Sequence, residues 1–225
     1  SKTYTIPNIK TSDAGTYDCI ISNSYNTVTS ISTTLTVNKS SQYINLPPID
    51  VKTYGDSPFT LPQTTDKGLE ITYQSLDERI AKIDRNIVTI TGAGTTDIIA
   101  SQGGNADYLS AESVSLRLTV NKIKQIIPFE ALPEKTYGDG SFILPEKTDK
   151  GFTISYESTN TNVATIEGNI VNIKNAGKTE IVATQAGNAY HYAANPVTQI
   201  LTVNKATQKV TFLPCLLYTS PSPRD

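Results

Sequence analysis

The pentapeptide Lys-Thr-Tyr-Gly-Asp occupies residues 52–56 and occurs a second time at residues 135–139, an offset of 83 residues. A second marker, Thr-Val-Asn-Lys, ends at Lys39, Lys122 and Lys205, with the same offset each time. Self-similarity at a fixed period is typical of repeat architectures, in which each repeat is one structural unit. The period therefore divides the 225-residue chain into modules before any single residue is interpreted.

The two complete repeats, residues 40–122 and 123–205, align without a gap, and close to half of their positions are identical. Within each repeat, short runs of alternating apolar and polar residues are separated by Gly, Pro, Asn and Asp, as in residues 69–75. This pattern predicts short strands with one buried face and no long helix. The fold class that it indicates is all-β, as tandem β-sandwiches in an extended array.

The positions predicted to form the core are apolar in both repeats and follow the period of a strand. They are Ile71, Tyr73, Ile83, Ile90, Ile98 and Ala100 in the first repeat, and Ile154, Tyr156, Ile166, Ile173, Ile181 and Ala183 in the second. Residues 42–46 are predicted to form an opening strand that stops at the Pro-Pro pair 47–48.

Residues 13–19 read Asp-Ala-Gly-Thr-Tyr-Asp-Cys. They match the D-x-G-x-Y-x-C pattern of immunoglobulin domains, so residues 1–39 resemble the C-terminal part of such a domain, in which Tyr17 would form the tyrosine corner. The resemblance implies strands at residues 20–22 and 27–37, and a disulfide from Cys19 to a strand upstream of Ser1. A catalytic thiol at Cys19 is the weaker interpretation, because no histidine lies near it in the sequence.

The end of the chain departs from the period. Residues 206–214 begin a third repeat, with Gln208 matching Gln125. Residues 215–225 resemble translated sequencing-adapter read-through and are interpreted as a non-native tail. We expect no disulfide between Cys19 and Cys215, since two repeats separate them.

Composition excludes several classes of function. The formal net charge is -2 and the isoelectric point is near 5.5, so no basic surface for nucleic acid is expected. No apolar run approaches the roughly 18 residues of a membrane span. The single histidine, His191, and the two cysteines offer no zinc cluster or histidine-based triad. We therefore expect no catalytic residues, no metal ligands and no cofactor.

The repeats resemble the bacterial immunoglobulin-like modules of surface proteins, in particular the MBG-type repeats of Bacteroidetes. The resemblance rests on Lys-Thr-Tyr-Gly-Asp, on residues 73–83 and 156–166, on the Ala-Gly-x-Thr of residues 93–96, on the Ala-x-Gln-x-Gly-Asn of residues 100–105, and on the closing Leu-Thr-Val-Asn-Lys. It implies that the sandwiches are tandem immunoglobulin-like β-sandwiches, and that they belong to a secreted or cell-surface protein with further domains.

Three features of the sequence are candidate sites. Residues 102–105 and 185–188 are interpreted as a strand end and a turn, with a polar binding loop as the alternative. Asp56 and Asp139 are interpreted as turn caps, with calcium as the alternative. Residues 190–192, Tyr-His-Tyr, are assigned to loop packing, with carbohydrate stacking as the alternative.

The function that these observations favour is a non-catalytic spacer segment. The joints at residues 38–41 and 121–124 contain neither Gly nor Pro and are expected to be stiff. The alternative is an adhesive or carbohydrate-binding module. Expected partners are other surface proteins or glycans, without nucleic acid and without a membrane span in this segment, and the array is expected to be monomeric.

Overall fold

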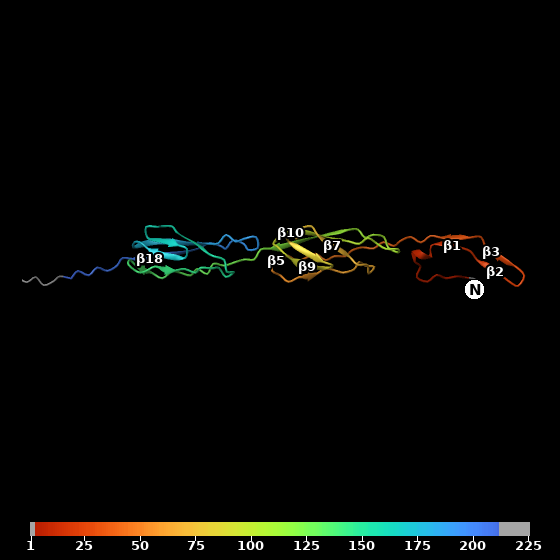
Figure 1. Ribbon diagram of the computed structural model, residues 1–225, viewed down its shortest axis with the longest axis horizontal. Helices are drawn as coiled ribbons and strands as arrows, with labels where there is room; N and C mark the ends of the chain where they lie inside the picture. The colour runs from red at the N-terminus through yellow and green to blue at the C-terminus, as the bar shows by residue number, and fades with distance from the viewer. Residues whose placement is uncertain (1–2, 212–225) are drawn as a thin grey trace, which may run out of the picture. The chain divides into compact units, whose positions relative to one another are not determined.

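The computed structural model describes residues 3–211, which contain strands β1 to β18 and one short 3₁₀ helix, η1 (Thr11–Asp13), and no α-helix. Two compact units make up this chain (Figure 1). The first comprises the residues up to Ile123 together with Ala189–His191, and the second comprises Lys124–Asn188 and the residues from Tyr192 onward. The prediction of an all-β chain of tandem β-sandwiches is confirmed.

The first unit contains one complete sandwich. A four-stranded sheet in the order β5-β11-β10-β7 faces a three-stranded sheet in the order β6-β9-β8. All neighbours pair antiparallel except β5 and β11, which run parallel with Lys52 opposite Val120. The strands are β5 (Lys52–Thr53), β6 (Phe59–Thr60), β7 (Thr72–Ser75), β8 (Ala81–Asp84), β9 (Ile87–Ile90), β10 (Gly94–Ser101) and β11 (Val114–Asn121).

The second unit repeats this topology strand for strand. Its sheets have the orders β12-β18-β17-β14 and β13-β16-β15, and β12 again runs parallel to β18. The strands are β12 (Lys135–Thr136), β13 (Phe142–Ile143), β14 (Ser155–Ser158), β15 (Ala164–Glu167), β16 (Ile170–Ile173), β17 (Gly177–Thr184) and β18 (Val197–Asn204).

Each sandwich has its own apolar core between its two sheets. Ile98 and Leu118 are fully buried in the first unit, as are Ile181 and Leu201 in the second. Burying a side chain of this size stabilises a fold by about 1.5–3 kcal/mol, so each core is a major source of stability for its unit.

Five of the twelve predicted core positions are only partly buried. Ile71, Tyr73, Ile98 and Ala100 are buried as predicted, as are Ile154, Ile181 and Ala183. The remaining predicted positions, Ile83, Ile90, Tyr156, Ile166 and Ile173, pack against the cores but are only partly buried. Val88 and Val171 are fully buried instead. Each lies within its strand, whereas Ile90 and Ile173 are the last residues of β9 and β16, at the rim of the core.

The predicted opening strand at residues 42–46 is wrong, because no strand forms there. Gln42 and Ile44 are buried, yet the only β-bridge beside this segment is an isolated parallel one between Ser40 and Tyr108. Side-chain hydrogen bonds from Gln42, described below, hold this segment where a ladder was expected.

Residues 3–39 contain two small ladders. β1 (Gly15–Tyr17) pairs with β4 (Thr33–Leu35), and β2 (Ile20–Ser22) pairs with β3 (Thr27–Thr29). The strand predicted at residues 27–37 is therefore interrupted between β3 and β4, where the Ser30 N–H donates to the Cys19 carbonyl (2.8 Å).

The tyrosine corner is present in this segment. The Tyr17 hydroxyl donates to the Asp13 carbonyl at 2.5 Å, which ties β1 back to η1. This is the bond that the pattern at residues 13–19 predicts.

Candidate functional site

The candidate binding loop at residues 102–105 is a tightly bonded turn. Gln102 follows β10, and its Oε1 accepts the Gly104 N–H at 2.6 Å. The Asn105 N–H donates to the Tyr108 carbonyl at 3.0 Å, and Asn105 Oδ1 accepts the N–H groups of Asp107 and Tyr108. The interpretation as a strand end followed by a turn is confirmed.

A buried polar network anchors this turn to the rest of the first sandwich. Gln42 Nε2 donates to Gln102 Oε1 and to the Leu109 carbonyl, the latter at 2.8 Å. Gln42 Oε1 accepts the Thr65 hydroxyl at 2.9 Å. Gln42 and Thr65 are 7% and 6% exposed, and a buried amide of this kind must be satisfied internally. The network therefore keeps these polar groups from being available to a ligand.

The second unit contains the same network at an offset of 83 residues. Gln125 donates to Gln185 and to the Tyr192 carbonyl, and the Thr148 hydroxyl donates to Gln125 Oε1 at 3.1 Å. The Gly187 N–H donates to Gln185 Oε1 at 2.6 Å, as Gly104 does in the first unit. No buried side-chain polar atom among the described residues lacks a hydrogen-bond partner. A fully paired buried network is typical of a device that fixes one packing arrangement.

The Tyr-His-Tyr segment is part of this packing. Tyr190 stacks on Tyr54, with ring centroids 4.4 Å apart and ring planes 15° from parallel. Tyr192 contributes its carbonyl to the network, while its side chain is 45% exposed. Loop packing, the preferred interpretation, therefore holds for the Tyr190 ring.

Asp56 and Asp139 cap turns, as predicted. Asp56 Oδ2 accepts the Thr53 N–H at 2.9 Å, and Asp139 Oδ2 accepts the Thr136 N–H at 2.8 Å. The intervening glycine adopts a positive φ, +93° at Gly55, which a residue with a side chain adopts only with strain. The described residues contain no group of three or more His, Cys, Asp and Glu that could hold a metal ion.

Asp66 and Asp149 form a second pair of capping carboxylates. Asp66 Oδ1 accepts the Tyr43 N–H at 2.8 Å, and Asp149 Oδ1 accepts the Ile126 N–H at 2.7 Å. This backbone hydrogen bond, followed by the adjacent lysine, lowers the carboxyl pKa of both residues below the usual value. Lys67 Nζ lies 2.9 Å from Asp66 Oδ2, and Lys150 Nζ lies 3.1 Å from Asp149 Oδ2. Each cap therefore ties to its sandwich a segment that forms no β-ladder.

These caps predict an acid-sensitive fold. A carboxyl whose pKa is lower in the folded state stabilises that state above the unfolded pKa, about 3.9, and the stabilisation is lost as pH falls through the folded pKa. We expect the melting temperature of each unit to decrease when the pH is lowered below about 4. Asp66→Asn with Asp149→Asn should flatten the pH dependence of melting between about pH 5 and pH 3.

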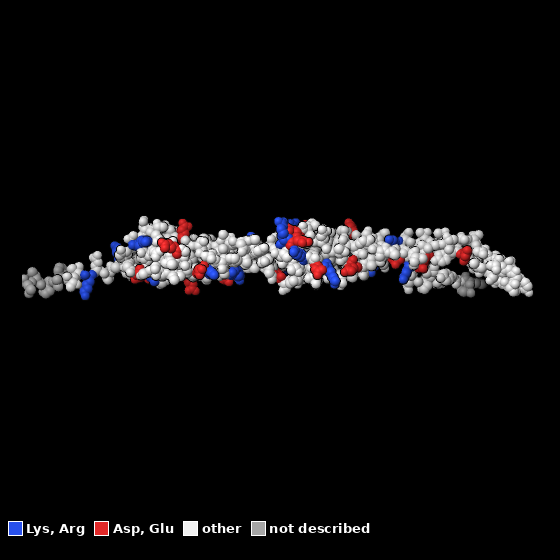
Figure 2. Space-filling view, in the orientation of Figure 1, with Lys and Arg blue, Asp and Glu red and all other residues white. Residues whose placement is uncertain are grey.

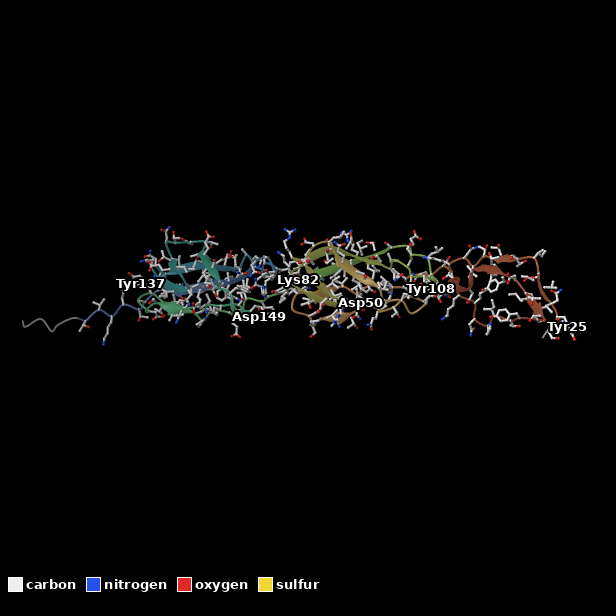
Figure 3. The ribbon with its side chains drawn as sticks, turned by 45° about the vertical axis from the view of Figure 1, so that its right-hand side comes forward. Tyr25, Asp50, Lys82, Tyr108, Tyr137 and Asp149 are labelled. Atoms are coloured by element: carbon white, nitrogen blue, oxygen red, sulfur yellow. The ribbon has the colours of Figure 1, made fainter. Side chains whose placement is uncertain are left out.

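The matched control for this experiment is Asp50→Asn. Asp50 is an exposed carboxylate whose side chain makes no hydrogen bond among the described residues, and Figure 3 labels both Asp50 and Asp149. Thermal melts followed by circular dichroism should give the same pH dependence for Asp50→Asn as for the parent chain. An unchanged slope in the double variant would contradict the role assigned to the caps.

Residues 1–39 expose much of their apolar surface. Ile20, Ile21, Val28 and Ile31 are 59–92% exposed, and Cys19 is a free, exposed thiol. Cys215 lies outside the described residues, so the expectation for this pair stays a prediction. Among the described residues, Cys19 belongs to no group of three or more His, Cys, Asp and Glu that could hold a metal ion.

The molecular surface carries charges of both signs. On the face drawn in Figure 2, Lys and Arg side chains are interspersed with Asp and Glu. None of the described helices is long and apolar enough to cross a membrane.

Comparison with known proteins gives no family. No protein-family model and no curated protein matches the chain. Extracellular domains 3–5 of Drosophila OTK match with 14% identity and a TM-score of 0.30, covering 88% of this chain and 73% of that one. Drosophila N-cadherin EC1-3 matches with 13% identity and a TM-score of 0.33, covering 91% and 82%. Domains 1–6 of the surface layer protein SbsC match with 15% identity and a TM-score of 0.32, covering 86% and 32%. At these identities and scores the likenesses give no information about function.

Two features of the packing were not expected from the sequence. The buried network of Gln42, Thr65 and Gln102 and the ring pair of Tyr54 and Tyr190 were both missed. A signal for the first existed, because all three network residues are identical in the second repeat while most exposed polar positions differ.

Proposed function

We propose that this chain is a non-catalytic spacer segment of a secreted or cell-surface multidomain protein, built from bacterial immunoglobulin-like repeats of the MBG type. The observation that carries the proposal is the contrast between interior and surface. The apolar core, the turn caps and the buried glutamine network occur in both units, whereas many exposed side chains differ between the two repeats. The ion pair of Asp77 and Arg79, for example, corresponds to Asn160 and Asn162 in the second repeat. Such a pattern supports a role that depends on the fold of the repeats and not on a polar site shared by both.

The domain organisation is part of the proposal. Residues 1–39 are the C-terminal part of an immunoglobulin-like domain, and residues 40–122 and 123–205 are the two repeats. Residues 206–214 begin a third repeat and residues 215–225 are a non-native tail; of these, residues 212–225 lie outside the described part of the chain.

A spacer predicts a fixed increment of length for each repeat. Inserting a further copy of residues 123–205 after Lys205 should raise the maximum dimension measured by small-angle scattering. The increase should be at least the length of an eight-residue closing strand such as β18, about 26 Å at ~3.3 Å per residue. An unchanged maximum dimension would contradict a spacer role.

The second candidate is an adhesive or carbohydrate-binding module. It is favoured by exposed apolar side chains at one equivalent position, Tyr43 (63% exposed) and Ile126 (67% exposed). A glycan array probed with the full chain and with the Tyr43→Ser, Ile126→Ser double variant tests it. We expect no glycan to bind the parent chain; binding that the double variant loses would replace the spacer by this candidate.

A further inference from the structure

The ring of Tyr54 is covered within the first unit. Tyr190 stacks on it, and Tyr54 is accordingly half-buried. The segment Ala189–His191, which belongs to this unit, is held by the Ile123 N–H donating to the Tyr190 carbonyl at 2.9 Å and by a parallel bridge between Ile123 and His191. The aromatic contact is therefore anchored by backbone bonds beside it.

The equivalent position in the first repeat makes a contact of different chemistry. Asp107 stands where the second repeat has Tyr190, and the Ser40 N–H donates to its carbonyl at 2.9 Å, as Ile123 does for Tyr190. Asp107 Oδ1 accepts the Thr11 hydroxyl at 2.7 Å and the Thr11 N–H at 3.1 Å. This loop position thus carries a carboxylate where it meets hydrogen-bond donors and a ring where it meets a ring.

The second unit contains the turn of Tyr54 in the same geometry. The Tyr54 N–H donates to the Asn121 carbonyl and the Tyr137 N–H donates to the Asn204 carbonyl, both at 2.8 Å. The next residue has φ of +93° at Gly55 and +98° at Gly138. Tyr54 and Tyr137 therefore follow equivalent parallel edge strands, β5 and β12, and have equivalent backbone geometry.

Tyr137 differs from Tyr54 in what covers it. No aromatic side chain stacks on Tyr137 among residues 3–211, and its side chain is 52% exposed. It borders an open hollow of about 490 Å³, at the end of the second unit where the chain continues beyond Lys205 (Figure 3). The hollow is lined by Tyr137, Asn175, Ala176, Lys205, Ala206 and Gln208.

We propose that the hollow around Tyr137 docks the loop of a further repeat of this kind, through a flat aromatic side chain at the position of Tyr190. The occupant is argued from the filled example in the first unit, which uses the same turn and the same type of ring. Offset-stacked rings prefer each other over a carboxylate, so an Asp at that loop position does not fit. This inference goes beyond the spacer role and does not depend on it, since a glycan-binding array would need the same docking.

The test measures how fast tetranitromethane nitrates each tyrosine, read by peptide mass spectrometry. The chain is the full protein with a second copy of residues 123–205 inserted after Lys205, and its partner variant has Asp for Tyr at the Tyr190 position of the inserted copy. Tyr25, 95% exposed, and Tyr73, 9% exposed, calibrate free and buried rings. We expect Tyr137 to react about two- to tenfold more slowly in the inserted chain than in the parent, the range set by a typical ring pair, and to recover its parent rate in the Asp variant.

Two results would overturn the proposal. One is an unchanged Tyr137 rate in an inserted chain whose extra copy gives its own thermal transition. The other is obtained without any insertion: Tyr190→Asp in the parent chain should raise the Tyr54 rate by a similar factor, and an unchanged rate would remove the filled example. If the inserted copy does not fold, this second measurement decides. If the maximum dimension did not increase on insertion but the nitration of Tyr137 became slower, the spacer role would be rejected and the docking proposal would stand.

Discussion

Replacing Ile181 by alanine will unfold the second sandwich at a much lower temperature and leave the first sandwich folded. Ile181 is fully buried at the centre of β17. Truncating such a side chain costs about 2–5 kcal/mol, because the lost contacts leave a cavity that relaxes only in part. A small domain has only about 5–15 kcal/mol of stability in total, so its melting temperature should fall by about 10–30 °C.

The matched control is Ile200→Ala on the neighbouring strand β18. Ile200 is 57% exposed and pairs with Glu180, one residue from Ile181. Differential scanning calorimetry should resolve two transitions, of which only one moves in Ile181→Ala, and neither should move by more than a few degrees in Ile200→Ala. A common shift of a single transition would mean that both cores unfold as one cooperative unit.

Of the two glycine-to-alanine substitutions in the turn at residues 102–105, Gly104→Ala should destabilise the first unit more. Its φ is +77°, and a Cβ there would lie 2.5 Å from the Tyr108 carbonyl oxygen and 2.8 Å from the Leu109 carbonyl carbon. The positive φ alone costs about 1–3 kcal/mol for a residue with a side chain. The close backbone approach adds to this cost, because the Gln102 turn must open to relieve it.

Gly103→Ala is the control, one residue away. A Cβ at Gly103 meets nothing within 4 Å, and the second repeat already has Ala186 there while keeping Gly187. Urea unfolding followed by circular dichroism should show a large loss of stability for Gly104→Ala and almost none for Gly103→Ala. Equal losses for the two variants would show that the turn, as described, does not constrain residue 104.

The sequence was sufficient for the repeat, the strands and most of the core because these depend on local periodicity. Tyr73, for example, lies between the polar residues Thr72 and Gln74 in β7, and a strand with one buried face places it in the core. The same reasoning cannot separate Val88 from Ile90, since both lie on one face of β9. Depth within the core depends on how far each strand overlaps the opposite sheet, which no local pattern records.

The polar network and the ring pair depend on contacts between distant residues. Gln42 bonds to Gln102 across 60 residues, and Tyr54 meets Tyr190 across a still longer separation. From the sequence alone, a glutamine next to apolar residues is predicted to be an exposed position of a strand, because its hydrogen-bond partners are not visible in the local pattern. Identity between the repeats marks Gln42 and Gln125 as special, but only the fold shows that they replace a ladder.

The parallel pairing of β5 with β11, and of β12 with β18, decides how each sandwich responds to being stretched by its ends. Lys52 lies opposite Val120, so tension applied before β5 and after β11 pulls two parallel strands in opposite directions. The hydrogen bonds between them lie across the direction of pull and must break together, whereas in an antiparallel hairpin pulled from its open end they break one at a time. Each sandwich should therefore yield abruptly, and each 83-residue repeat then supplies up to about 270–300 Å of extended chain.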